Sequence, residues 1–267
     1  MSDTHPNAIH SRIWREEPEP DNPFTTRAAY CRGFDVYGEM LGQARWVEML
    51  FLLFRDEPPT ASQADLLEAL ALALANPGPR DASVHAAMAG GVCGSTAASS
   101  LMAALAVGAG QLAGGREVFL AMENWAACGT GLDAWRDRLP TRTASPGSIW
   151  PVPEHTPGFD PHGTCTSTPV RQTLACLAGL SSGPYLGWLE QNLAALEATA
   201  SCPLALSGVA AAAFADLGFT PEQGEMLHLL LRLPGAAAHA VEQRQYGHKK
   251  FPFGNIELET DPVQEPV

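Results

Sequence analysis

Basic residues are scarce in this chain, and their scarcity excludes one large class of ligand. The 267 residues contain 16 Lys and Arg against 29 Asp and Glu, which gives a formal net charge of −13. A surface that neutralises the phosphates of a nucleic acid is therefore not expected. The phosphates of a small ligand would need a local cluster of basic side chains that acts against the overall field.

Paired cysteines and long apolar runs are also missing. The six cysteines lie far apart and form no CxxC pair, which favours the reduced thiols of a cytoplasmic protein. The apolar stretches are interrupted by Gly and Ser, so no membrane span is predicted. The first 23 residues are polar and lack the pattern of a signal peptide. We therefore expect a soluble, cytoplasmic protein without a membrane partner.

Aromatic residues make up only 7% of the chain, whereas apolar residues as a whole make up 46%. Abundant Ala and Leu with few β-branched residues favour closely packed helices over sheet. No strand pair is predicted, and the expected fold class is mainly α. Helical patterns and end signals predict helices over 46–54, 60–74, 83–108, 116–139, 169–181, 184–200, 203–217, 221–232 and 235–246.

Two segments differ from this helical pattern. Residues 1–23 contain four prolines, which predicts a flexible N-terminal arm. Residues 140–168 form the longest irregular segment and are rich in Pro, Gly, Ser and Thr. Long ordered loops in compact domains are often functional. This one places His155, Asp160 and His162 within eight residues of one another.

Five segments resemble the citrate synthase superfamily, and in particular its citryl-CoA lyase branch. The most specific is Arg232–Gln243, which follows the family's GR-x-x-G-x-x-AH-x-x-EQ helix at the same spacing. Tyr30–Asp35 is similar to the family's RGYD turn, and residues 52–60 are similar to its LL-x-x-G-x-LPT pattern. Pro157–Phe159 resembles the start of the GFGH loop, and Gly247–Ile256 resembles the end of the lyases.

The resemblance implies a citrate-synthase-like architecture with two helical domains. Residues 1–115 and 207–267 would form the large domain, including the N-terminal arm, and residues 116–206 the small one. Ligands would bind in the cleft between them. The family is dimeric, and the small residues around 84–108 suit either a tight interface between subunits or a close helix pair in the core.

The resemblance also implies which chemical groups an active site of this family needs. A carboxylate removes a proton from the acyl-CoA, two histidines polarise the thioester and the ketone, and arginines hold the dicarboxylate. The family's histidines fall here on Pro77, Ala113 and Pro161. The family's catalytic Asp falls near Leu204–Ser207. Residues 201–215 contain no Asp or Glu at all. A citrate synthase reaction by the family's mechanism is therefore not expected.

An altered site is expected in the irregular loop instead. His162, Asp160 and His155 are the candidate catalytic residues, as acid and base, because they lie in the segment that resembles the family's active-site loop. The same residues also fit a solvated polar loop that has no role in catalysis. His and Asp are metal-ligand types as well, but their Pro-interrupted spacing matches no metal motif, so no metal is expected.

Four residues are candidates for substrate binding. Arg232 matches the family's carboxylate-binding Arg directly, and Arg171 adjoins Val170, where the Arg of the family's DPR motif falls. The family's Arg that reaches the partner subunit's site falls on Phe251 or Lys250, and Lys250 would keep its charge but not its planar fork. Lys250 also fits a basic surface patch. His239 follows Arg232 on the same predicted helix, where a packed histidine is the alternative interpretation.

Two functions remain open on this evidence. The favoured one is a divergent citrate synthase-like or citryl-CoA lyase-like enzyme, a lyase or acyltransferase that makes or cleaves a C–C bond in a carboxylated acyl-CoA-type substrate. It would hold no tightly bound cofactor, and the CoA thioester would be a substrate. The alternative is a catalytically inactive paralogue that acts as a ligand-binding, regulatory or partner subunit. The expected assembly is a homodimer or a heteromer with an active homologue.

Overall fold

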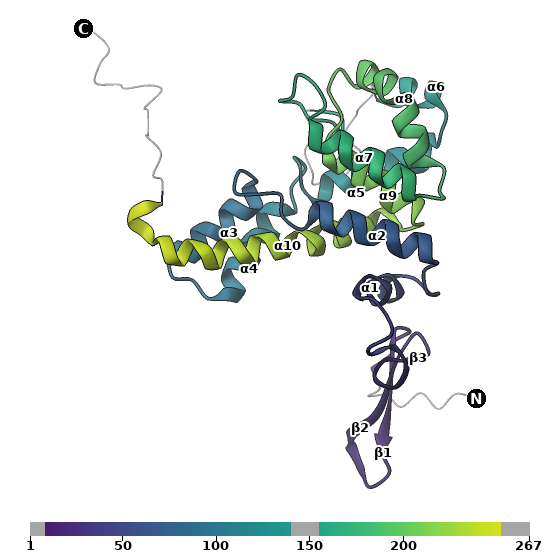
Figure 1. Ribbon diagram of the computed structural model, residues 1–267, viewed down its shortest axis with the longest axis vertical. Helices are drawn as coiled ribbons and strands as arrows, with labels where there is room; N and C mark the ends of the chain where they lie inside the picture. The colour runs from purple at the N-terminus through teal and green to yellow at the C-terminus, as the bar shows by residue number, and fades with distance from the viewer. Residues whose placement is uncertain (1–8, 140–154, 252–267) are drawn as a thin grey trace. The chain divides into compact units, whose positions relative to one another are not determined.

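A computed structural model describes residues 9–139 and 155–251, and helices dominate both ranges (Figure 1). The chain divides into two compact units. Unit 1 comprises Met1–Ala75 and Gly108–Arg232, and unit 2 comprises Asn76–Val107 and Leu233–Val267. The large and small domains expected from the resemblance follow other boundaries, and that division stays a prediction.

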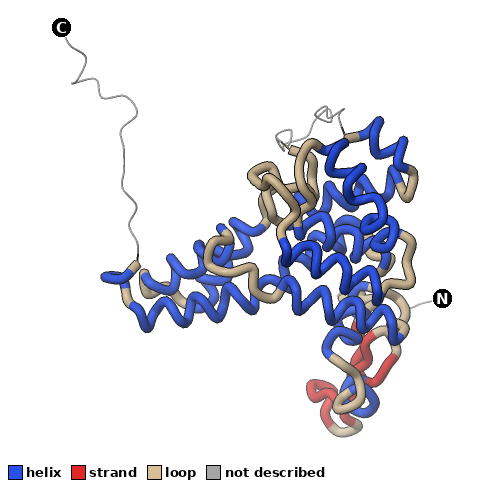
Figure 2. The backbone as a smooth tube through the Cα atoms, turned by 45° about the horizontal axis from the view of Figure 1, so that its top comes forward, coloured by secondary structure: helices blue, strands red, loops and turns tan. Residues whose placement is uncertain are grey.

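Unit 1 contains a small sheet followed by a layered set of helices (Figure 2). Its elements in chain order are β1 (Trp14–Glu19), β2 (Asn22–Cys31), β3 (Phe34–Asp35), the π-helix η1 (Val36–Met40), α1 (Trp46–Phe54), α2 (Ala61–Leu74), α5 (Gly115–Cys128), α6 (Leu132–Arg138), α7 (Thr168–Leu180), α8 (Tyr185–Ala200), α9 (Leu206–Asp216) and the first part of α10 (Pro221–Tyr246).

The hairpin of β1 and β2 corrects the expectation of a flexible arm without strands. β2 pairs antiparallel with both β1 and β3. The prolines are accommodated because Pro18 lies at an irregularity of the register and Pro20 lies in the turn. Pro23 lies near the start of β2, opposite the turn end of β1. Proline is tolerated at such positions, where no regular ladder bond is needed.

Most helix predictions are confirmed, and the end signals explain why. Thr60 caps α2 with its side chain, and Gln63 completes a capping box. The stretches predicted as one helix over 83–108 and over 116–139 are each two helices in the structure. Gly94 and Gly129 adopt positive φ values of +77° and +52° at the two breaks. Conversely, the two helices predicted over 221–246 are one. Pro234 lies inside α10, where it removes one backbone hydrogen bond without ending the helix.

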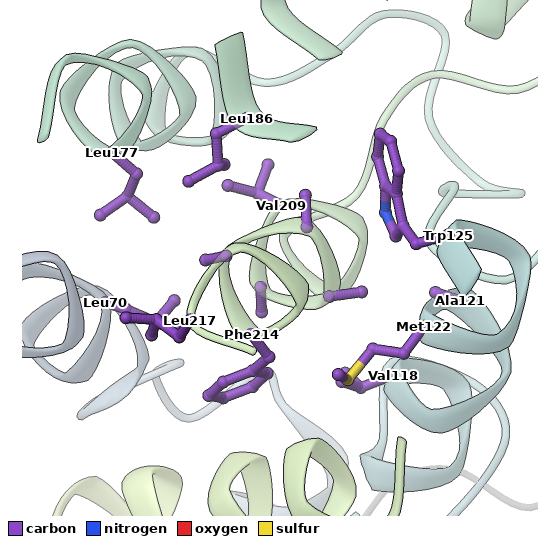
Figure 3. Close-up of a cluster of buried hydrophobic side chains, with 14 of the residues drawn as sticks. Leu70, Val118, Ala121, Met122, Trp125, Leu177, Leu186, Val209, Phe214 and Leu217 are labelled. Atoms are coloured by element: carbon purple, nitrogen blue, oxygen red, sulfur yellow. The ribbon is translucent and has the colours of Figure 1, made fainter. Parts of the chain in front are cut away.

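The core of unit 1 surrounds α9 (Figure 3). Residues 209–214 of this helix are all 0% exposed, and α2, α5, α7 and α8 pack against it. Four consecutive alanines let these neighbours approach closely, while Phe214 fills the space at the end of the helix. Because α9 is buried on every side, its first turn holds polar groups in a fixed place within unit 1.

Unit 2 is smaller and consists of α3 (Ala82–Val92), α4 (Ala97–Gly108), the second part of α10 and the 3₁₀ helix η2 (His248–Lys250). Its core is built from small side chains, including Ala87, Ala236 and Ala240. A Cβ on Gly91 would lie 2.2 Å from the carbonyl oxygen of Ala240. The small residues of α3 therefore serve close packing within the chain, and the dimer interface stays a prediction.

Cysteine reactivity offers a direct test of burial within unit 1. Burial raises the pKa of the thiols of Cys31 and Cys128, so both stay protonated at neutral pH. We expect iodoacetamide to label the exposed Cys93, Cys165 and Cys176 at least tenfold faster, as read by peptide mass spectrometry. Equal labelling rates in the folded protein would contradict the burial of Cys31 and Cys128.

No helix among the described residues is long and apolar enough to span a membrane.

Candidate functional site

The first turn of α5 places a carboxylate in the interior of unit 1. Glu117 is 1% exposed, and it accepts hydrogen bonds at both carboxylate oxygens. Oε1 accepts from the backbone N–H of Gly158 at 2.9 Å and from the hydroxyl of Ser207 at 2.8 Å. Oε2 accepts from the backbone N–H of Ala113. These donors offset the cost of burying the charge, and they join three segments of the chain.

The irregular loop packs directly on the start of α9. The backbone N–H of Asp160 donates to Pro203 O at 2.8 Å, and that of Ala205 donates to Gly158 O at 3.0 Å. Two glycines allow this approach. Gly158 has a φ of +88°, and a Cβ on Gly208 would lie 2.3 Å from Gly158 O. Only residues without a side chain fit both positions.

His155 is the candidate catalytic residue that the structure brings closest to this carboxylate. Its Nε2 lies 3.7 Å from Glu117 Oε1, and its side chain is 8% exposed. The distance is that of an ion pair and exceeds that of a hydrogen bond. A buried imidazole beside a buried carboxylate is an arrangement that can hold and transfer a proton.

Arg232 and His228 lie one helical turn apart on α10, at the other side of the Ala113 segment. Arg232 is 9% exposed, and its Nη1 donates to Ala113 O at 2.6 Å. The same Nη1 lies 3.0 Å from His228 Nε2. A guanidinium only donates hydrogen bonds, so His228 accepts at Nε2 and is neutral in this contact. The result is a buried positive charge next to the loop that Glu117 holds.

Asp160 and His162 lie on the same loop, but the hydrogen bond between them is local to that loop. The Oδ1 of Asp160 accepts the backbone N–H of His162 at 2.9 Å, which closes a local turn. The side chain of His162 is exposed. Arg171 is also exposed, on the first turns of α7. Among the described residues, no hydrogen bond or ion pair joins any of these three side chains to Glu117, and their roles stay predictions.

His239 and Lys250 belong to unit 2. The ring of His239 lies 3.2 Å from Asn76 Oδ1 and 3.3 Å from Glu242 Oε2, within that unit. Lys250 is exposed at the end of η2. Glu154, the acidic neighbour of His155 in sequence, lies outside the described residues. The substrate-binding roles of His239 and Lys250 also stay predictions.

Sequence reasoning missed three members of the cluster: Glu117, Ser207 and His228. The position of Glu117 could have been recognised from the sequence. It is the third residue of a helix whose N-cap is Gly114, and a carboxylate there commonly accepts hydrogen bonds from the backbone at the start of the helix. His228 and Arg232 are four residues apart, which places them on one face of a helix. Ser207 had no such signal, because its partner lies 90 residues away.

A hollow at the hairpin of unit 1 is a weaker candidate. It has a volume of about 550 Å³ and lies at the hairpin, where Arg12, Arg15 and Arg32 line it. Arg32 is paired with Asp56 at 2.7 Å, and Arg15 is paired with Glu17 at 2.7 Å and stacked on Tyr30. Arg15 and Arg32 therefore already have carboxylate partners at this hollow. We take the cluster around Glu117 as the candidate site because the irregular loop is bonded to it through Gly158.

Among the described residues, no group of three or more His, Cys, Asp or Glu side chains has an arrangement that could hold a metal ion.

Comparison with known proteins identifies the fold. No protein-family model matches the chain, and no curated protein matches it in sequence. Among solved structures, the citryl-CoA lyase of Hydrogenobacter thermophilus is similar with a TM-score of 0.74 and 18% identity, covering 97% of each chain. The chain has the citrate-synthase-like fold of citryl-CoA lyase. The mainly α fold class and the structural resemblance predicted from the motifs are thereby confirmed.

Two ATP citrate lyases also share this fold. The enzyme of Methanothrix soehngenii, in complex with citrate and coenzyme A, has a TM-score of 0.73 and 16% identity. A mutant of the Methanosaeta concilii enzyme, in complex with (3S)-citryl-CoA, has a TM-score of 0.73 and 15% identity. The chain spans 43% of the length of each of these two enzymes.

Proposed function

We propose that this protein makes or cleaves a C–C bond in a carboxylated acyl-CoA-type substrate, through a site that differs from that of citrate synthase. The fold supports the substrate class, because solved structures with this fold bind citrate, coenzyme A and citryl-CoA. The single observation that carries the proposal is the buried polar cluster of unit 1. It joins Glu117, His155 and Arg232 around the Ala113 segment, where the resemblance places the family's active site.

In the direction of cleavage, the reaction needs a base and a carboxylate anchor. A base takes the proton of the hydroxyl on the carbon that bears the carboxylate. The bond between this carbon and the α-carbon of the thioester then breaks, and its electron pair forms the thioester enolate. Protonation of the enolate at carbon gives a shorter acyl thioester and a keto acid. We assign the anchor to Arg232, because a guanidinium binds a carboxylate by two parallel hydrogen bonds.

The other candidates keep supporting roles in this proposal. Asp160 and His162 would supply a second acid–base pair on the loop, and Arg171, His239 and Lys250 would contact the acyl or CoA part of the substrate. The exposure of His162, Arg171 and Lys250 is consistent with access to a ligand. The expected dimer, or a heteromer with an active homologue, also stays part of the proposal.

Turnover by the purified full-length protein tests the proposal. Citryl-CoA and other 3-carboxy-3-hydroxyacyl thioesters are offered, and the keto acid is measured by coupled reduction. Arg232→Ala is expected to lower kcat/KM about a hundredfold, because the carboxylate loses its anchor. Arg136→Ala is the matched control, since Arg136 is exposed and pairs with Asp133. Absence of turnover with every thioester would overturn the proposal.

A catalytically inactive, ligand-binding subunit is the second candidate. The observation that favours it is that both oxygens of Glu117 are engaged by internal donors, as in a structural network. This candidate predicts that calorimetry detects binding of citrate or CoA without turnover, that Arg232→Ala weakens this binding, and that the protein co-purifies with an active homologue.

A further inference from the structure

We infer that the hollow at the hairpin of unit 1 is a second ligand site, which binds the phosphate of a nucleotide-type molecule. Its volume of about 550 Å³ is within the range of about 300–1,000 Å³ that is typical of small-molecule sites. An inorganic phosphate would fill only part of this space, so a larger molecule that carries phosphate fits it better. The hollow does not include the Glu117 cluster, and the inference does not depend on the reaction proposed above.

Positive charge exceeds negative charge in the lining of the hollow. Three guanidinium groups and one carboxylate line it, those of Arg12, Arg15, Arg32 and Asp56. Glu17 pairs with Arg15 at 2.7 Å, but it also pairs with Arg27 at 2.9 Å, so its single charge is shared between two cations. In a chain with a net charge of −13, this local excess is the kind of basic cluster that a phosphate ligand requires.

Arg32 has a donor edge that its protein partners leave open. Its Nη1 pairs with Asp56 Oδ1 at 2.7 Å and donates to Arg12 O at 3.3 Å. Among the described residues, Nε and Nη2 have no hydrogen-bond partner, and Nε is buried. These two nitrogens form the edge of a guanidinium that binds an oxyanion by two parallel hydrogen bonds. A phosphate on this edge supplies both acceptors, which is favourable because a buried donor without a partner destabilises a protein.

The backbone conformation at Arg32 is also unusual. Arg32 and Gly33 are the two residues of the turn between the paired residues Cys31 of β2 and Phe34 of β3. Their φ values are +52° and +95°. A turn with positive φ at both central residues favours Asn, Asp or Gly, so Arg is an unfavourable choice at the first of them. Residues held in such conformations cluster at ligand-binding sites, which is consistent with a role for Arg32 in binding.

Arg12 and Arg15 complete the set of donors. The side chain of Arg12 is exposed, and within residues 9–139 and 155–251 no hydrogen bond or ion pair engages its guanidinium. The guanidinium of Arg15 stacks on the ring of Tyr30 at 4.0 Å, so its N–H groups stay at the edge of the stack. A terminal phosphate has three acceptor oxygens and can bind three separate guanidinium groups, whereas a carboxylate has only two. The three arginines therefore favour phosphate over carboxylate.

Apolar side chains in the lining suit the rest of a nucleotide. Ile13 and Trp14 line the hollow and are 38% and 37% exposed. A nucleobase has flat faces that stack on aromatic side chains. Two sources share this chemistry, a free nucleotide and the nucleotide end of coenzyme A, and the ligands of the titration below distinguish them.

Isothermal titration calorimetry of the full-length protein tests the site. ADP represents a free nucleotide, and adenosine 3′,5′-bisphosphate represents the nucleotide end of coenzyme A. We expect at least one of them to bind about tenfold or more tightly than adenosine, which lacks phosphate. The tighter of the two identifies the source. Absence of binding by both, or equal affinity for adenosine, would overturn the inference.

Two substitutions assign the binding to the hollow. Arg12→Ala is expected to weaken nucleotide binding about tenfold, because one guanidinium is lost. Asp56→Asn is expected to strengthen it about threefold, because a carboxylate that competes for Arg32 is removed. Asp56 is 93% exposed, and a gain of affinity cannot result from unfolding. Arg136→Ala is the matched control, since it removes the same charge as Arg12→Ala from an exposed position outside the hollow.

The pattern across variants separates this site from the proposed active site. Nucleotide affinity that is lost in Arg12→Ala and kept in Arg136→Ala and Arg232→Ala would support the second site, whether or not any thioester is turned over. Affinity that Arg12→Ala leaves unchanged, or that Arg136→Ala lowers equally, would overturn it. Unchanged or weaker binding by Asp56→Asn would overturn the role given to Arg32.

Discussion

Replacing Glu117 with alanine is expected to lower the free energy of unfolding by about 3–5 kcal/mol. The substitution removes the acceptor for the N–H groups of Ala113 and Gly158 and for the hydroxyl of Ser207. Each buried donor left without a partner costs about 1–3 kcal/mol, and the methylene groups removed leave a cavity in addition. Urea denaturation followed by circular dichroism measures the change.

Glu123→Ala is the matched control for this prediction. Glu123 lies on the same helix α5, but its side chain is exposed. Its removal is expected to change the free energy of unfolding by less than about 0.5 kcal/mol. A loss below 1 kcal/mol for Glu117→Ala, with the control unchanged, would show that Glu117 does not hold the three segments together.

Gly208→Ala is expected to lower the free energy of unfolding by about 3 kcal/mol, since a Cβ at this position meets backbone atoms. It would lie 2.3 Å from Gly158 O and 2.9 Å from a methyl carbon of Leu204. Relief of the first clash requires the loop at Gly158 to move away from α9, which also breaks the hydrogen bond from Gly158 N to Glu117. Thermal unfolding and the turnover assay should therefore report losses together.

Gly187→Ala separates this clash from the general effect of adding a methyl group. Gly187 lies inside α8, and a Cβ there meets no atom within 4 Å. Alanine at an open helical position favours the helix by about 0.5–1 kcal/mol over glycine. We expect this variant to be more stable than the wild type. An equally large loss in both glycine variants would contradict the role given to the approach of Gly158 and Gly208.

Local signals account for the helices that could be predicted. α2 begins after Thr60 because its hydroxyl and the Gln63 side chain satisfy the first N–H groups, and both residues are read directly from the sequence. The break after Asn76 and the start of α10 at Pro221 have equally local causes. The hairpin was not predicted, because its prolines suggested irregular chain. Proline prevents a regular strand only where its missing N–H would be needed for a hydrogen bond to the neighbouring strand. Whether it is needed depends on the strand pairing, which is not a local property of the sequence.

The features of the candidate site also fall into two groups, those that the sequence reveals locally and those that depend on tertiary packing. The amino-acid sequence determined the chemical inventory: Ala113 and Pro161 in place of histidines, no carboxylate between 201 and 215, and Arg232 within a helix that resembles the citryl-CoA lyases. Only the tertiary structure decided that Glu117 meets Gly158 and Ser207, which are 41 and 90 residues away. The reason is physical. Hydrogen bonds over such separations depend on how α5 and α9 pack, and this packing is set by the whole core and not by the residues that make the bonds.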